Sequence, residues 1–394
     1  MLPLDDARAL IASKTHRLNA ETIALADARG RILHGRVTAP ADIPAFDHSA
    51  VDGYAIADEG GHAYRRVMAI PAGEFPTRQI GQGECARIFT GAAIPPGTNR
   101  VVMQEFANVA EDIVTFTPGF KGTNIRRRGE DARAGAVLLE DGTRLGPVEM
   151  GLLAQLGVTR TSVAKRPRVL HVATGGELVD PGGEPAPGQI RDSNSTLIAA
   201  LIADAGADIA GHRRVGDGIE ILVEAVNGTP ESGWQVLLIS GGASVGDYDF
   251  GRRAIEKMGF TVHFHQLNLR PGKPLIYATR QRQVAFVIPG NPLSHFVCWH
   301  AVIRGVFDVL AVGRVDSEAA RVLLGGERAL AGNPRETCWP ARLKVQDGQV
   351  TAIPLKWQSS GDLTGLCGVN ALLRIPANSP EIMPGSQLSA FLLR

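Results

Sequence analysis

Between residues 167 and 310, short apolar runs of strand length alternate with segments of helical periodicity, and this alternation constrains the fold most strongly. The apolar runs cover residues 169–173, 236–240 and 284–288, and the helical segments cover 195–205, 219–226 and 293–310. Buried strands separated by helices predict a doubly wound parallel α/β sheet with helices on both faces. Such sheets bind their ligands at the carboxyl ends of the strands.

The regions on either side of this segment differ in character. Residues 1–35 have helical periodicity, whereas residues 36–165 alternate short β-favouring runs with Gly and Pro turns, which predicts a β-rich module. After Gly313 the helical signal fades, and residues 318–394 predict a compact β domain. We therefore expect a multidomain α/β plus β protein with regions at 1–165, 166–312 and 318–394.

Composition and charge exclude several classes of protein. The 41 basic and 40 acidic residues give a formal charge of +1, so no general attraction to nucleic acid or membrane is implied. The four cysteines lie far apart without a C-x-x-C spacing, which favours the reducing cytoplasm. The first residues include acids where a signal peptide carries lysines, and no apolar run approaches the roughly 20 residues of a bilayer span. We therefore predict a cytoplasmic protein without nucleic-acid or membrane partners.

The segment Ser240-Gly-Gly-Ala-Ser-Val-Gly-Asp-Tyr-Asp249 directly follows an apolar run. Gly241 and Gly242 lack the Cβ atoms that would block close approach of a phosphate to backbone amides. Two carboxylates follow, and Asp249 is the stronger candidate for metal-assisted chemistry than Asp247. The segment predicts a site for a phosphorylated ligand and a divalent metal, although by itself it is equally typical of a plain turn.

Three further polar segments lie at predicted strand ends or turns. They are Thr174-Gly-Gly-Glu177, Arg270-Pro-Gly-Lys273 and Pro289-Gly-Asn-Pro-Leu-Ser294. Glu177 is placed either for ligand or metal contact or as a helix cap. Arg270 and Lys273 suit a single anion, or else a solvated turn. Pro292 suits the first turn of a helix, which leaves Asn291 and Ser294 in a rigid loop.

The N-terminal half contains three more segments that place polar side chains beside glycine. They are Asp47-His-Ser-Ala-Val-Asp-Gly-Tyr54, Thr90-Gly-Ala-Ala-Ile-Pro95 and Asn124-Ile-Arg-Arg-Arg-Gly-Glu-Asp131. Residues of a separate domain can complete a site across a cleft. Taken singly, these segments also fit common turns and a solvated run of charge.

Taken in their order along the chain, from Asp47 to Ser294, these seven segments resemble the molybdopterin molybdenumtransferase family, the MoeA-like enzymes related to the E domain of gephyrin. The resemblance implies a magnesium-dependent enzyme that inserts molybdate into adenylated molybdopterin and releases AMP without using ATP. It implies a homodimer of four-domain subunits: an elongated N-terminal domain with a β-rich domain inserted at about 45–140, the α/β domain, and a small β-barrel-like C-terminal domain. The active site would lie between subunits. Molybdopterin adenylyltransferase and molybdoenzyme apoproteins or their chaperones are the partners it suggests.

The same resemblance assigns roles to individual residues. The implied catalytic acids are Asp52, Asp131, Glu177, Asp217 and Asp249, of which Glu177, Asp217 and Asp249 would hold Mg²⁺. The implied substrate-binding residues are Thr90, Ser240, Gly241, Gly242, Ser244, Arg270, Lys273, Pro289, Asn291, Pro292, Ser294 and Ser360. Molybdate is a dianion, and Arg270, Lys273, Ser294 and Ser360 are its expected ligands.

The sequence departs from the family pattern at three places. Arg270 replaces the first lysine of the family's Lys-Pro-Gly-Lys turn, Gln266 replaces a second lysine, and Pro340 stands where many relatives have arginine. Arg335 or Arg342 is a candidate substitute. Two other functions share some of the features. Molybdopterin adenylyltransferase lacks the N-terminal residues and the C-terminal β domain, and a scaffold without turnover has no need of the catalytic acids.

Overall fold

The computed structural model describes residues 1–394 except 59, 231–232, 244–249, 316–318, 347 and 394. The chain divides into two compact units. The large unit comprises Met1–His34, Arg144–Gly146 and Arg160–Arg394, and the small unit comprises Gly35–Thr143 and Pro147–Thr159. Each unit is described separately.

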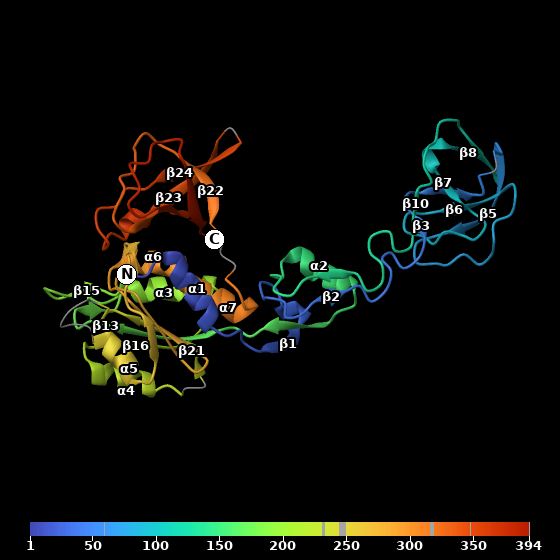
Figure 1. The fold of residues 1–394 in the computed structure, drawn as a ribbon. Helices are drawn as coiled ribbons and strands as arrows, with labels where there is room; N and C mark the ends of the chain where they lie inside the picture. The colour runs from blue at the N-terminus through green and yellow to red at the C-terminus, as the bar shows by residue number, and fades with distance from the viewer. Residues whose placement is uncertain (59, 231–232, 244–249, 316–318, 347, 394) are drawn as a thin grey trace. The chain divides into compact units, whose positions relative to one another are not determined.

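The centre of the large unit is a six-stranded sheet with the strand order β16-β13-β17-β21-β20-β18. Figure 1 labels its strands β13, β16 and β21. Its strands are β13 (Arg168–Thr174), β16 (Asp208–Val215), β17 (Val236–Ser240), β18 (Thr261–Phe264), β20 (Ile276–Arg280) and β21 (Gln283–Ile288). The first four strands in this order pair in parallel, and β20 and β18 extend the sheet with antiparallel pairs. The predicted α/β class is therefore confirmed, with an antiparallel addition at one edge.

Helices cover both faces of this sheet because alternate residues of its strands are apolar on both sides. One face packs on α1 (Leu4–Lys14), α3 (Ser193–Asp204) and the helix that begins with α6 (Pro292–Cys298). The other face packs on α4 (Ile219–Asn227) and α5 (Phe250–Lys257). In β17, Leu238 belongs to the first core and Leu237 to the second, so a single strand serves both.

The predicted helix 293–310 consists of α6, a π-helical segment Trp299–Ile303 and α7 (Arg304–Val312). By length and composition this 21-residue segment is long and apolar enough to cross a bilayer, which corrects the expectation from the sequence that no run approaches that length. However, 72% of its apolar window is buried inside the protein. Its hydrophobicity is explained by its place in the core of the large unit.

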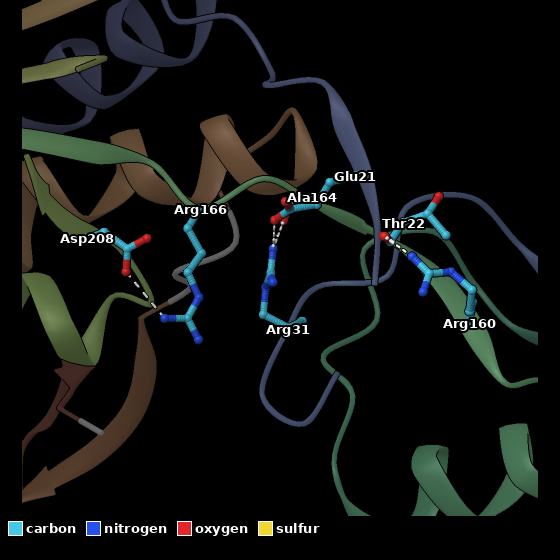
Figure 2. Close-up of polar contacts among 7 residues, drawn as sticks. All are labelled: Glu21, Thr22, Arg31, Arg160, Ala164, Arg166 and Asp208. Atoms are coloured by element: carbon cyan, nitrogen blue, oxygen red, sulfur yellow. Dashed lines mark hydrogen bonds and ion pairs between the residues drawn. The ribbon is translucent and has the colours of Figure 1, made fainter. Parts of the chain in front are cut away.

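The N-terminal segment differs from the continuous helical region that its periodicity predicts. Only α1 is an α-helix; β1 (Ala20–Ala24) and a 3₁₀ turn (Leu25–Asp27) follow it. β1 pairs antiparallel with β12 (Arg160–Ala164), and its β-branched Thr22 and Ile23 favour a strand. Figure 2 shows polar contacts around this pairing: the Arg31 guanidinium donates to the Ala164 carbonyl at 2.7 Å, and the Arg160 guanidinium donates to the Thr22 carbonyl at 3.0 Å.

The C-terminal part of the large unit is a small barrel. Its strands are β22 (Ala320–Leu324), β23 (Glu336–Gln346), β24 (Gln349–Pro354), β25 (Ala371–Ile375) and β26 (Gln387–Leu392). The pairings β23–β24, β24–β22, β22–β26, β26–β25 and β25–β23 close on themselves. A ring of paired strands has no free edge, so the predicted barrel-like domain is confirmed. The short β19 (Leu269–Arg270) pairs with β23 and joins the α/β part to this barrel.

The small unit contains a six-stranded sheet of order β7-β4-β6-β5-β9-β8. Its strands are β4 (Gly53–Ile56), β5 (Ala63–Ile70), β6 (Glu84–Ile88), β7 (Arg100–Met103), β8 (Ala107–Ala110) and β9 (Ile113–Phe116). Short pairs outside the sheet are β2 (Val37–Thr38) with β11 (Val137–Leu139) and β3 (His48–Ser49) with β10 (Ile125–Arg126). The helix α2 (Pro147–Gln155) completes the unit.

Candidate active site

Predicted site residues of the α/β domain follow four neighbouring parallel strands. Glu177 follows β13, Asp217 follows β16, Gly241 follows β17 and Pro289 follows β21. The strand register aligns these ends, because Ala173 lies opposite Ser240 and Ser240 lies opposite Ile288. One edge of the sheet therefore collects residues that are more than 100 positions apart in the chain, as the doubly wound topology predicts.

The glycine turn after β17 is shaped by contacts within the protein. The Gly241 amide donates to the Ile288 carbonyl at 2.9 Å, so it is engaged. Gly241 and Gly242 have φ values of +97° and +67°. A Cβ on Gly241 would meet the side chain of Thr174, and one on Gly242 would lie 2.7 Å from the Phe250 ring. The sequence attributes these glycines to phosphate approach; the structure shows that close packing on β13 and α5 already requires them.

Ser244 and Asp249, which the sequence predicts as substrate-binding and metal-binding residues, lie outside the described residues. Asp247 lies outside them as well. The described part of the turn comprises Ser240, Gly241, Gly242 and Ala243.

Two carboxylates, Glu177 and Asp217, follow the neighbouring strands β13 and β16 and influence each other electrostatically. The pKa of Asp217 is raised above its ordinary value, first by partial burial and then by the negative charge of Glu177, while the Thr174 hydroxyl lowers it. The Glu177 carboxylate lies over Gly175, where an added Cβ would be 2.7 Å from Glu177 Oε2. Glu177 is not the cap of α3, because Asp192 occupies that position and accepts from the Ser195 amide at 2.9 Å.

This pair is the part of the site that fits a divalent cation. Within the described ranges, no group of three or more His, Cys, Asp or Glu side chains is arranged to hold a metal. Mg²⁺, however, keeps several waters and is commonly bound by one or two carboxylates together with substrate phosphates. The mutual repulsion that raises the pKa of Asp217 is the repulsion that a cation would relieve. Glu177 and Asp217 therefore fit Mg²⁺ as a two-carboxylate site.

The loop after β21 is held by contacts from two other segments. Asn291 precedes α6 without capping it; its side-chain amide donates instead to the Ser360 hydroxyl at 2.9 Å. The Leu293 amide donates to the Ser360 carbonyl at 3.0 Å, and the Asn194 side chain donates to the Gly290 carbonyl at 2.6 Å. The structure therefore brings Ser360 to the loop containing Asn291 and Pro292. Ser294 is only 4% exposed.

The two predicted cations lie on a turn beside the barrel. Arg270 ends β19, whose neighbour is β23, and its guanidinium lies 5.4 Å from the ring centroid of Trp357. The backbone of Lys273 is fixed in this turn, because its carbonyl accepts from the Leu267 amide at 2.9 Å. A Cβ on the intervening Gly272 would lie 2.7 Å from Cys298 Sγ, so this turn also packs closely on α6.

The structure separates the two candidate substitutes for the missing C-terminal arginine. The Arg335 guanidinium donates to the Leu269 carbonyl at 3.2 Å, next to the cation turn. The Arg342 guanidinium donates to the Gly368 carbonyl at 3.1 Å. Pro340 itself is buried in β23. Arg335 is therefore the cation of this stretch that lies beside Arg270.

The small unit brings together Asp52 and Thr90. Asp52 Oδ1 accepts from both the amide and the hydroxyl of Thr90 at 2.8 Å, and these bonds lower the pKa of Asp52. Asp131 is elsewhere engaged, in an ion pair with Arg126. The next two arginines are paired as well, Arg127 with Asp47 at 2.6 Å and Arg128 with Asp42 at 2.8 Å. The run of three arginines is thus a set of ion pairs that ties segments of this unit together.

Sequence reasoning missed several residues that contact the predicted ones. Trp357 lies against Arg270, and His171 and His295 both contact the hydroxyl of Ser240. Their sequence signals are weak: a histidine inside an apolar run and a histidine in a helix are compatible with simple burial. Only the pairing of β13 with β17 and the position of α6 bring them together.

Three family models match consecutive parts of the chain. The MoeA N-terminal region (domains I and II) matches residues 2–157, the probable molybdopterin-binding domain matches 171–308, and the MoeA C-terminal region (domain IV) matches 327–393. Fold and sequence together define a MoeA-like protein.

Individual relatives are similar to this chain over nearly its whole length. The molybdopterin molybdenumtransferase of Nostoc sp. is 32% identical, with coverage of 96% of this chain and 90% of that protein. Molybdopterin molybdenumtransferase 2 of Mycobacterium tuberculosis is 31% identical over 99% of each chain. The crystal structure of the molybdopterin biosynthesis MoeA protein from Pyrococcus horikoshii OT3 has a TM-score of 0.84 and 25% identity, with 100% coverage of both. The chain belongs to the molybdopterin molybdenumtransferase family, whose members are transferases of molybdenum cofactor biosynthesis.

Replacing Asp217 with Asn tests the carboxylate pair. Because the pKa of Asp217 is raised in the folded protein, its ionisation costs stability as pH rises through that pKa. Asp217→Asn should therefore raise the Tm of the metal-free protein by roughly 1 °C at neutral pH, a small change because the side chain is exposed and screened. The difference should vanish at a pH low enough to protonate Asp217. Calorimetry in EDTA across this pH range measures it.

The same variant should lose the increase in Tm that Mg²⁺ gives the wild-type protein. Asp180→Asn is the matched control, because Asp180 pairs with Arg214 at 2.7 Å instead of with a second acid. A variant Asp217→Asn that keeps the full Mg²⁺ response would contradict the assignment of this pair.

Proposed function

We propose that the protein is a molybdenum insertase, which inserts molybdate into adenylated molybdopterin and releases AMP in a magnesium-dependent step. The observation that carries this proposal is the gathering of Glu177, Asp217 and the glycine turn at one sheet edge, in a member of the molybdopterin molybdenumtransferase family. A phosphorylated ligand at the turn would present its phosphates beside the carboxylate pair.

In this proposal Glu177 and Asp217 hold Mg²⁺, with Asp249 as a third acid. Bound there, the cation supplies a Lewis acid at the phosphoanhydride. The nearby Thr174 hydroxyl opposes the increase in the pKa of Asp217 that burial and Glu177 cause.

Arg270 and Lys273 are the proposed ligands of the molybdate dianion. The Arg270 guanidinium lies over the ring of Trp357, and this contact restricts its orientation. The restriction matters because arginine replaces a lysine here and its forked group differs in shape from an ammonium group. The Ser360 hydroxyl accepts from the Asn291 side chain and lies three residues after Trp357 in the chain. Arg335 adds positive charge next to the turn. This arrangement supports an oxyanion site between the α/β part and the barrel of the large unit.

Two other functions remain as competitors. A molybdopterin adenylyltransferase would form AMP-linked molybdopterin from ATP, whereas an insertase consumes that product. The chain also contains a small unit and a C-terminal barrel, and an adenylyltransferase function would give neither of them a role. A binding scaffold would bind molybdopterin without turnover and would not respond to molybdate.

Purified protein given adenylated molybdopterin, Mg²⁺ and molybdate should release AMP, and omission of either ion should abolish the release. Glu177→Gln and Asp249→Asn should slow the release at saturating molybdate, since each removes a proposed metal ligand. Chromatographic measurement of AMP and reconstitution of a molybdoenzyme give independent readouts. AMP release that ignores molybdate, or no release by the wild-type protein, would refute the insertase function.

Lys273→Ala should raise the molybdate concentration for half-maximal AMP release by about 10-fold or more, because it removes one of two cations at the dianion. Its rate at saturating molybdate should fall much less. Lys344→Ala is the control, because Lys344 is an exposed lysine of β23 and should leave the molybdate dependence unchanged. An unchanged requirement in Lys273→Ala would place the molybdate elsewhere.

We also propose a homodimer in which Asp52, Thr90 and Asp131 of one subunit serve the α/β domain of its partner. Mixed dimers of Asp52→Asn and Lys273→Ala then contain one intact site each. The assay uses a molybdate concentration too low for the Lys273→Ala protein to act. Random mixing of the two variants should then restore about one quarter of wild-type activity, because half of the dimers are mixed and half of their sites are intact. Sedimentation establishes the oligomer, and no recovery on mixing would show that each subunit uses its own residues.

A further inference from the structure

A chain of four polar side chains crosses one side of the α/β sheet and passes through Ser240. His171 Nε2 lies 2.7 Å from Ser240 Oγ, and His295 Nε2 lies 2.9 Å from the same atom. On its other side, His171 Nδ1 lies 3.2 Å from His212 Nδ1. The four residues come from β13, β17, α6 and β16. None of the assigned roles of the site uses the three histidines.

This chain runs from the surface into the core. His212 is exposed on the edge strand β16, whereas His171 is 2% exposed, Ser240 4% and His295 0%. Polar groups buried this deeply must be paired, because an unpaired one loses its hydrogen bonds to water without replacement. Ser240 thus has its hydroxyl enclosed by two imidazoles.

Both imidazoles around the hydroxyl are neutral. Burial lowers the pKa of His171 to about 3, with a further decrease from the neighbouring His212 and His295. Burial lowers the pKa of His295 to about 4, against the opposing influence of the Asn291 carbonyl and the Asp192 carboxylate. A neutral imidazole has one nitrogen that donates and one that accepts.

The number of available protons determines the hydrogen bonding of the Ser240 hydroxyl. A hydroxyl has a single proton, so Ser240 donates to one imidazole and accepts from the other. His295 Nδ1 is buried beside the Asn291 carbonyl, which raises the pKa of His295 against the effect of burial. In either direction of donation along the chain, the Ser240 proton lies on a hydrogen bond to one of the two imidazoles.

The hydroxyl proton of Ser240 is consequently not available to a phosphate, which accepts hydrogen bonds and needs donors. Ser240 is also the last residue of β17 and the first of the glycine turn, and its carbonyl accepts from the Thr174 hydroxyl at 3.3 Å. Holding its side chain from both sides fixes the point where the turn begins.

We propose that His171 and His295 are positioning residues that clamp the Ser240 hydroxyl and so set the conformation of the ligand-binding turn at residues 240–242. Ser240 then acts on the ligand through the position of the turn instead of through its own proton. The clamp itself is a property of the free protein. Its effect on ligand binding rests on the proposed molybdopterin-binding role of the turn.

The clamp is measured first without ligand. Nitrogen NMR of the histidine rings near neutral pH should show Nε2 protonated in one of His171 and His295 and unprotonated in the other, with both rings neutral. Hydrogen exchange of the Gly241 amide, which is bonded to Ile288, should be faster in His171→Leu and in His295→Leu than in the wild type. The control His263→Leu removes a similar contact, His263 Nε2 to Thr279 Oγ1 at 2.7 Å, from β18, and it should leave Gly241 unchanged.

Gln variants separate the clamp from general packing, because a Gln side chain reaches the position of Nε2 and retains a hydrogen bond to Ser240. His171→Gln and His295→Gln should keep Gly241 protected and should remain folded if the Leu variants do not. A cationic ring, two protonated Nε2 atoms, or Gly241 exchange that is the same in the Leu and Gln variants would overturn the clamp.

Molybdopterin binding tests its consequence. His295→Leu should raise the Kd for molybdopterin about 10-fold, equal to about 1.4 kcal/mol, while His295→Gln should restore most of the affinity. Ser240→Ala should add little in the His295→Leu background, since both changes release the same hydroxyl contact. Fully additive losses would show that Ser240 binds the ligand directly and would overturn the inference. If the clamp is found by NMR and wild-type protein does not bind molybdopterin, the proposed function fails and the clamp stands.

Discussion

The parallel register of β13, β17 and β21 is the constraint on which the rest of the site depends. Ala173, Ser240 and Ile288 lie side by side across these strands, so the segments that follow them begin at the same level. A slip of one residue would move His171 and Leu238 to the opposite face of the sheet and would exchange the two apolar cores. The same pairing that buries the core therefore places the carboxylates, the glycine turn and the Pro289 loop at one edge.

The glycines of the candidate site are required by close packing inside the protein as well as by the proposed approach of a ligand. Gly241, Gly242 and Gly272 each lie against another side chain, those of Thr174, Phe250 and Cys298 respectively. A motif rich in glycine, which predicts a ligand site, therefore also has a second physical cause, the close approach of protein to protein. Ligand approach and internal packing favour the same residue here, and only the atoms around each Cα separate them.

Much of the α/β part could be predicted because its signals are local. The strands at 169–173, 236–240 and 284–288 follow from apolar runs, and α4 and α6 begin within one residue of their predicted starts. The N-terminal strand β1 was missed because its partner β12 lies about 140 residues away. The histidine chain was missed for the same reason: residues 171, 212, 240 and 295 share no spacing, and only strand pairing makes them neighbours.

The acids of the two units are tuned in opposite directions, and this contrast separates their chemistry. In the small unit, Asp52 accepts two hydrogen bonds from Thr90, which lower its pKa and keep it charged without any cation. In the large unit, burial and Glu177 raise the pKa of Asp217, so its charge is held at a cost. A site that stores unfavourable charge gains most when a cation binds, because the repulsion becomes attraction. For that reason we propose Glu177 and Asp217 as the metal ligands, whereas the negative charge of Asp52 is already stabilised by Thr90.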